Sequence, residues 1–161
     1  MTKIRKFPTL SVQRVEGGKD AVKVVEDLIS RLGFSPESCQ RENTAETARW
    51  MIPLQDDKEL EILIENLKKP LETTAYIGVN ICTVPLRGSF DLITAALEVA
   101  DGLIGVKISL VGHYLVLSAS LSASGLTGEE LEYYVKLINA QESWFREELI
   151  AELGWDDMPD A

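Results

Sequence analysis

The stretch HYLVLSASLSASGLTGEEL, from His113 to Leu131, changes its pattern in the middle. Its first half alternates apolar and small polar residues, which is typical of a β-strand with one buried face. After Gly125 comes Thr127-Gly128-Glu129-Glu130, a T-x-x-E capping box that marks the start of a helix. We expect this helix to continue to about Leu153, where Gly154 stops it. At roughly 40 Å it would be longer than the rest of the domain can cover, so its end should overhang and pack on a partner.

The residues just before this stretch predict a second strand that pairs with the first. VKISLVG (106–112) and HYLVLSASL (113–121) flank Gly112–His113, and glycine in the first turn position suits a type II′ hairpin. Val106, Ile108 and Leu110 should share one face with the apolar residues of the following strand.

Further elements are predicted upstream. Residues 20–32 carry apolar side chains at helical spacing, with Asp20 as N-cap and Gly33 as the closing residue. Residues 48–54 and 73–85 read as strands, and Pro53 should place the first at a sheet edge or end it there. Ser89 is expected to cap an apolar helix with few charges that stops near Gly102 and lies well buried.

Residues 57–69, DKELEILIENLKK, fit two patterns. Leu60, Ile62 and Ile64 alternate with glutamates as in a strand, whereas Leu60, Leu63, Ile64 and Leu67 fit a helix. We choose the strand because the neighbouring strands need a partner and the connections are short. The order is then helix, three strands, helix, two strands and long helix, which is an α+β class with helices packed on an antiparallel sheet.

Composition limits the classes of function. The 161 residues are 45% hydrophobic and 26% charged, with a formal net charge of −10. This balance argues against nucleic acid and against an anionic membrane surface as partners. The charge is uneven: residues 1–31 have a net charge of +3 and residues 127–161 a net charge of −8. A solvated acidic helix face explains this, and attraction between the two ends is the alternative.

The sequence predicts a single domain over 1–161, with an ordered core of about 18–155 and an acidic tail at 156–161. Cys39 and Cys82 have no CxxC spacing, so we expect reduced thiols in a cytoplasmic protein. The N-terminal residues contain no apolar run typical of a secretory signal, and no run is long enough to cross a bilayer.

No set of residues identifies a reaction. His113 is the only histidine and is expected in a turn, without a partner to orient it. The serines at 118, 120, 122 and 124 lack a G-x-S-x-G elbow and should lie on a solvated strand face. The pairs Asp56–Asp57 and Asp156–Asp157 lack the spacing of a calcium loop. We therefore expect no catalytic residue, no metal site and no cofactor.

Aromatic side chains are the better candidates for a binding role. On the last helix, Trp144 is rotated by about 100° from Phe145 of the inward stripe, so it should lie at the border of that stripe. Aromatic residues at such borders are enriched where proteins meet partners. We take Trp144, Trp155, Tyr133 and Trp50 as candidate partner-binding residues, with core packing under a long helix as the alternative.

Three segments resemble YbjN-type proteins: LVGHYLVLSASLSASGLTGEELEYYVKLINAQESWF (110–145), RWMIPLQ (49–55) and TVPLRGSFDLITAALEVADGL (83–103). The likeness spans about residues 20–153 and is similar to the type III secretion chaperone-like fold. LETTAYIGVN (71–80) points to a bacterial subgroup of unknown function.

Secretion chaperones of this fold are small, acidic and usually dimeric, and they hold extended client segments without catalysing a reaction. The resemblance therefore implies a cytoplasmic, non-enzymatic protein-binding module that acts as a chaperone or regulatory adaptor, as a homodimer. The alternative is a small-molecule sensor or enzyme with a pocket between sheet and helices.

Overall fold

A computed structural model describes residues 17–54, 58–69 and 72–156. The expectations for residues 1–16, for the acidic tail beyond Asp156 and for the Asp56–Asp57 pair lie outside these ranges. The elements are α1 (Gly17–Arg31), α2 (Pro36–Cys39), β1 (Gln40–Asn43), β2 (Ala48–Pro53), β3 (Glu59–Glu65), β4 (Thr74–Thr83), α3 (Ser89–Ala100), β5 (Lys107–Val111), β6 (Tyr114–Ser122) and α4 (Gly128–Leu153).

The strands form one antiparallel sheet in the order β1-β2-β3-β4-β6-β5. This confirms the predicted α+β class and the order of its main elements. The short helix α2 and the four-residue strand β1 are additions that the sequence did not indicate. β2 ends at Pro53, which confirms one of the two alternatives expected for this proline. The neighbouring strand β1 pairs with residues 48–50 of β2, so Pro53 lies outside the part of β2 that β1 covers.

Residues 59–65 form a strand, which confirms the prediction, and this strand, β3, pairs along its length with β2 and β4. Leu60, Ile62 and Ile64 are fully buried, while Glu59 and Glu65 are exposed. The hydrogen bonds and burial available on both sides of the strand outweigh the helical pattern that the same residues also fit.

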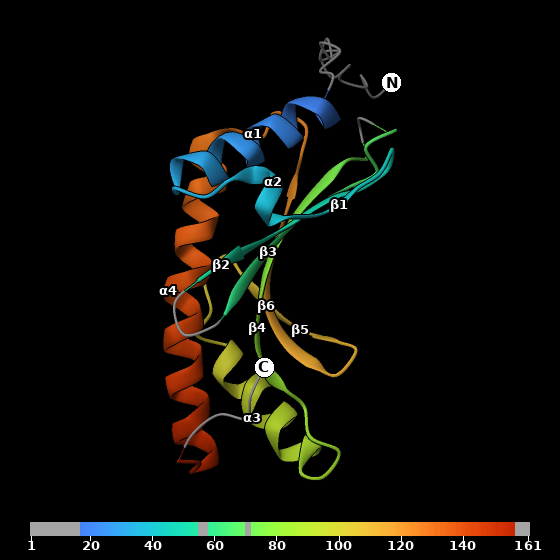
Figure 1. Cartoon of the computed structure of the whole chain (residues 1–161). Coiled ribbons are helices and arrows are strands. Elements are labelled where there is room, and N and C mark those ends of the chain that lie inside the picture. Colours follow the sequence, from blue (N-terminus) through green and yellow to red (C-terminus); the bar gives the residue numbers. More distant parts are fainter. Residues whose placement is uncertain (1–16, 55–57, 70–71, 157–161) are drawn as a thin grey trace, which may run out of the picture.

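The long helix α4 packs against β4 and β6 of the sheet and forms the core with it (Figure 1). Its ends are as predicted: Glu130 donates its backbone N–H to the Thr127 hydroxyl at 3.1 Å, and Gly154 has a φ of 63°. The expected overhang is wrong, because α3 packs along the C-terminal part of α4, where Phe145 and Leu149 are fully buried.

Three local expectations need correction. Asp20 lies within α1, which begins at Gly17, so it is not the N-cap. Gly88, with a φ of 78°, precedes α3, and Ser89 is the first helical residue. Ser118 is fully buried opposite Gly78, because β6 lies inside the sheet and both of its faces are covered there; Ser120, Ser122 and Ser124 are exposed as expected.

Candidate functional site

The four aromatic candidates do not form one surface. Trp50 is 0% exposed in the middle of β2, so its side chain offers no area to a partner. Trp155 is partly buried and packs on the hydrophobic core. Tyr133 is 59% exposed near the start of α4, and Trp144 is 36% exposed three turns further along. Only Tyr133 and Trp144 therefore offer substantial exposed area.

Trp144 lies against the end of α3. A Cβ atom built on Gly102 would come within 2.6 Å of Cη2 of the Trp144 ring, so the ring occupies the space that this glycine leaves free. Most of the Trp144 side chain therefore packs inside the chain, which agrees with the alternative of core packing, and 36% of it stays exposed.

The helix α3 carries apolar side chains on two opposite faces. Leu92, Ala95 and Ala96 are buried against the rest of the protein. Phe90 and Leu97, seven residues apart and therefore on one side of the helix, point away from that core and are 79% and 66% exposed. The expectation that α3 lies well buried is thus wrong for the side that carries Phe90 and Leu97.

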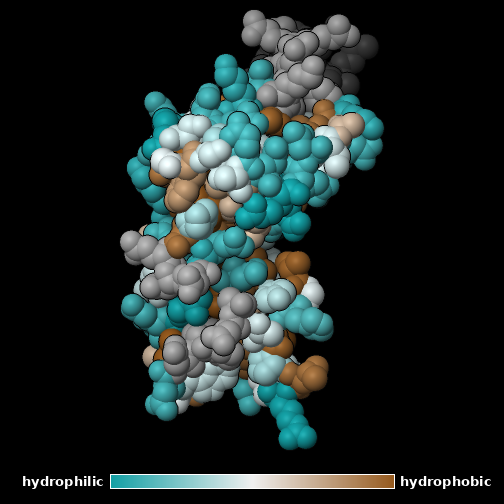
Figure 2. All heavy atoms as spheres, in the orientation of Figure 1, coloured by the Kyte–Doolittle hydropathy of each residue, from teal (hydrophilic) through white to brown (hydrophobic). Residues whose placement is uncertain are grey.

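More large apolar side chains are exposed near this helix. Among the described residues, seven of the eleven exposed large hydrophobic side chains come from residues 86–114. We call them the α3–hairpin surface: Leu86, Phe90, Leu97, Ile104, Leu110, Val111 and Tyr114. Figure 2 shows hydrophobic side chains at the surface over α3 and the β5–β6 hairpin. Leu110 lies on the helix-covered face of the hairpin and Val111 and Tyr114 on the opposite face, so these side chains surround this end of the sheet. Exposed large apolar side chains gathered in one part of a soluble protein are candidates for an interaction site.

The hairpin forms where the sequence predicts it. Gly112 has a φ of 60° and His113 does not have a positive φ, which fits a type II′ turn. His113 is exposed at the hairpin tip. Leu110, expected to share a face with Ile108, is 55% exposed, whereas Ile108 is partly buried and packs on the core.

The two sheet edges differ in how they are protected. The edge strand β1 has four polar residues, QREN, and an irregular register with β2. The edge strand β5, KISLV, is regular and mostly apolar, and Lys107 is its only charged residue. Short, charged or bulged edges resist pairing with another chain, whereas a regular apolar edge invites it. The β5 edge is therefore the open one, and it belongs to the α3–hairpin surface.

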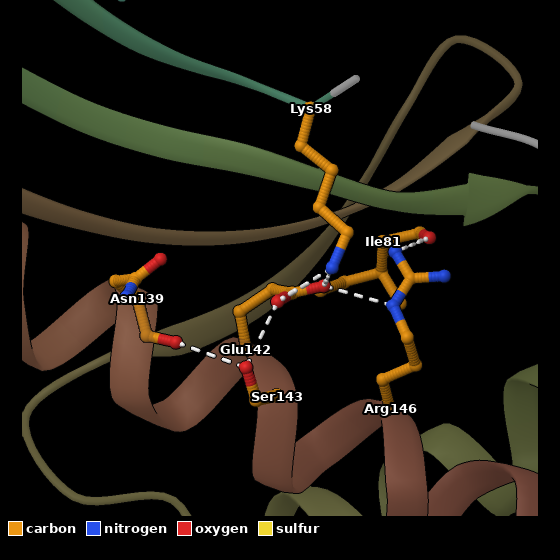
Figure 3. Close-up of polar contacts among 6 residues, drawn as sticks. All are labelled: Lys58, Ile81, Asn139, Glu142, Ser143 and Arg146. Carbon is orange, nitrogen blue, oxygen red and sulfur yellow. Dashed lines mark hydrogen bonds and ion pairs between the residues drawn. The ribbon is translucent and has the colours of Figure 1, made fainter. Parts of the chain in front are cut away.

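A polar cluster lies on the other side of α4. Glu142 is 3% exposed, and its Oε1 is 3.0 Å from Lys58 Nζ and 2.8 Å from Arg146 Nε (Figure 3). Arg146 also donates from Nη2 to the backbone carbonyl of Ile81 at 2.6 Å. One carboxylate thus holds two cations, and the cluster ties α4 to β4 and to the start of β3. Nothing in the sequence spacing of Lys58 and Glu142 predicts this contact.

A pocket opens beside this cluster, between α4, the ends of β2 and β3, and the C-terminal end of α1. Its volume is about 610 Å³, and it is lined by Leu32, Phe34, Ile52, Pro53, Leu54, Lys58, Leu60, Val135, Lys136, Asn139, Glu142 and Ser143. Of the described residues that line it, Glu142 is the one carboxylate, and His113 is not among them.

Other features concern metals, thiols and membranes. Over the described ranges, no three histidine, cysteine or acidic side chains come together where they could hold a metal ion. Cys39 and Cys82 are both buried and unpaired. Burial raises the pKa of the Cys82 thiol to about 11, which keeps it protonated and unreactive at neutral pH. No helix within the described residues is long and apolar enough to span a membrane.

Comparison with known proteins defines the fold. No family model matches the chain. No curated protein matches it either. Among solved structures, a chain of the ExsC–ExsE complex matches with a TM-score of 0.59 and 12% identity over 82% of this chain and 95% of that one. The Yersinia pestis type III secretion chaperone SycH, in complex with a fragment of YscM2, matches with a TM-score of 0.51 and 10% identity over 78% and 98%.

YbjN from E. coli matches with a TM-score of 0.53 and 17% identity over 83% of this chain and 92% of YbjN. At these identities the likenesses establish the fold alone. The chain has the type III secretion chaperone-like α+β fold, and YbjN shares it, as the three sequence segments indicated.

Proposed function

We propose that this protein is a non-enzymatic, chaperone-like protein-binding module or regulatory adaptor that acts as a homodimer in the cytoplasm. The observation that carries the proposal is the α3–hairpin surface, where apolar side chains adjoin an unprotected strand edge. Burying such side chains contributes about 25 cal/mol for each Å² of apolar area removed from water. A partner that covers this surface therefore gains both apolar burial and backbone pairing.

A second copy of the chain is the occupant that we propose for the α3–hairpin surface. In a twofold dimer each copy presents the same patch to the other, so an apolar helix face meets its equivalent and both are buried. Residues 86–114 include few charged side chains to oppose this contact. Trp144 would lie at its border, through its contact with Gly102.

Protein binding is supported further by the fold. The similar chains include one from the ExsC–ExsE complex and the chaperone SycH bound to a fragment of YscM2, so two different chains with this fold hold another protein. We propose by analogy that a client or regulated protein binds this chain, with Tyr133 as one contact outside the dimer surface. We also propose that residues 1–161 form one domain, since the buried side chains form one core cluster.

Light scattering tests the dimer. The chain has a mass of 17.9 kDa. The wild type should have twice this mass at micromolar concentration, and Phe90→Glu with Leu97→Glu should have the monomer mass, because two charges would have to be desolvated in the interface. Lys23→Glu adds the same negative charge to exposed α1 and should remain dimeric. A monomeric wild type, or a dimeric double variant, would reject the proposed interface.

Client binding needs a separate test. Affinity capture from the native host, followed by reconstitution with the purified candidate, should give a stoichiometric complex that forms without turnover of any substrate. Tyr133→Ala should weaken that complex and leave the dimer mass unchanged. Absence of any reconstituted complex, together with a catalysed change in the captured molecule, would contradict the non-enzymatic role.

A further inference from the structure

The pocket beside Glu142 has an apolar wall and a polar end, and it takes no part in the proposed dimer contact. Leu32 and Phe34 stand at its mouth as exposed large apolar side chains, and Leu54 and Val135 continue the apolar wall inward. The volume of about 610 Å³ is within the range of small-molecule sites, which is roughly 300–1,000 Å³. The pocket can therefore accept an apolar group of several carbon atoms.

The polar end of the pocket adjoins a cluster in which, among the described residues, two cations share one carboxylate. Lys58 and Glu142 line the pocket, whereas Arg146 does not line it but contacts the same carboxylate; the two contacts are 3.0 and 2.8 Å. The side chains of Lys58 and Arg146 are about four-fifths buried, so water screens their charges poorly. Lys136 also lines the pocket and is balanced by Glu132 at 2.7 Å.

We infer that this pocket binds a small carboxylic acid with an aliphatic chain. The carboxylate would lie next to Lys58 and would add a second negative charge beside the two cations, which share only Glu142 among the described residues. The Ser143 hydroxyl and the Asn139 side chain, both in the pocket lining, offer further hydrogen bonds to the carboxylate. The chain of the acid would lie against Phe34, Leu54 and Val135. This inference does not rest on the proposed dimer, because α3, β5 and β6 contribute no residue to the pocket.

Octanoate is a suitable probe, with octanamide as its uncharged equivalent. Titration of the full chain, followed by amide chemical shifts, should give saturable changes at Phe34, Leu54 and Asn139. Octanamide should bind at least tenfold more weakly, because a charge-assisted hydrogen bond is lost. Lys58→Gln should reduce octanoate affinity to a similar degree, with Glu142 still paired to Arg146. Lys107→Gln on β5 removes the same charge away from the pocket and should leave the affinity unchanged.

Three results would overturn the inference. Octanoate and octanamide could bind the wild type with equal affinity, which would exclude recognition of the carboxylate. This comparison can be made without any variant. The shifts could be confined to residues 86–114, which would mean non-specific binding to the α3–hairpin surface. A peptide with a free C-terminal leucine could bind where octanoate does not, which would make the pocket a peptide site. Each of these outcomes leaves the light-scattering test of the dimer unaffected.

Discussion

Glu142 is the residue whose removal should cost the most stability outside the apolar core. Replacing it by leucine leaves Lys58 and Arg146 largely buried without their shared counter-ion, and breaking a buried pair in this way typically costs about 3–5 kcal/mol. Urea unfolding followed by tryptophan fluorescence measures the change in unfolding free energy.

The matched control for Glu142 is Glu46. Its carboxylate pairs with Lys68 at 2.9 Å, a contact as short as that of Lys58 with Glu142, but both partners are mostly exposed. Exposed pairs contribute little, because solvent screens them and side-chain entropy opposes them. Glu46→Gln should therefore unfold like the wild type. Equal losses in Glu142→Leu and Glu46→Gln would show that burial of the cluster does not matter.

Cys82 provides a prediction about pH. Burial raises the pKa of its thiol from 9.0 to about 11 in the folded chain, so above pH 9 the unfolded state releases a proton that the folded state retains. The thiol therefore contributes stability that is present below pH 9 and is lost as the pH rises toward 11. The unfolding free energy should fall more steeply over this interval in the wild type than in Cys82→Ala. Parallel pH profiles would show that Cys82 is solvated.

At the scale of single elements, the stability of α4 depends on its N-cap residue, Thr127. Thr127→Ala removes the hydroxyl that accepts the backbone N–H of Glu130, and losing an N-cap of this kind costs about 1 kcal/mol. For a chain of this length that should lower the melting temperature by about 2–4 °C. Ser120→Ala, at an exposed position on β6, should melt like the wild type. If Thr127→Ala is as stable as Ser120→Ala, the Thr127 hydroxyl does not stabilise α4.

The elements that the sequence predicts well are those with a local cause. Thr127 and Gly154 bound α4 through capping chemistry, and Gly112 fixes the hairpin through its positive φ. β1 could not be predicted, because its sequence QREN has no alternation typical of a strand. It becomes a strand only by pairing with β2 in the folded chain. The Glu142 cluster could not be predicted either, since its members are brought together only when α4 crosses the sheet.

The helix α3 shows what a pattern leaves open. Its sequence is apolar on nearly all sides, which predicts burial. The structure buries one side, at Leu92 and Ala96, and leaves Phe90 and Leu97 exposed. Apolar periodicity alone cannot tell whether the second side of a helix is covered by the same chain or by another copy. For this reason the sequence does not predict the exposed side chains of α3.

For the whole molecule, the account depends on a partner copy covering the α3–hairpin surface. The edge strand β5 has backbone groups that no neighbouring strand of the sheet pairs. In a dimer that includes this edge, amide hydrogens of residues 107–111 are shielded from water, whereas in a monomer those on the outer side exchange freely.

Hydrogen–deuterium exchange of β5 tests this claim most directly. In the wild type at micromolar concentration, residues 107–111 should exchange slowly, and Phe90→Glu with Leu97→Glu should accelerate their exchange while residues 59–65 of β3, inside the sheet, remain protected in both. Equal exchange of residues 107–111 in the wild type and the double variant would contradict the account.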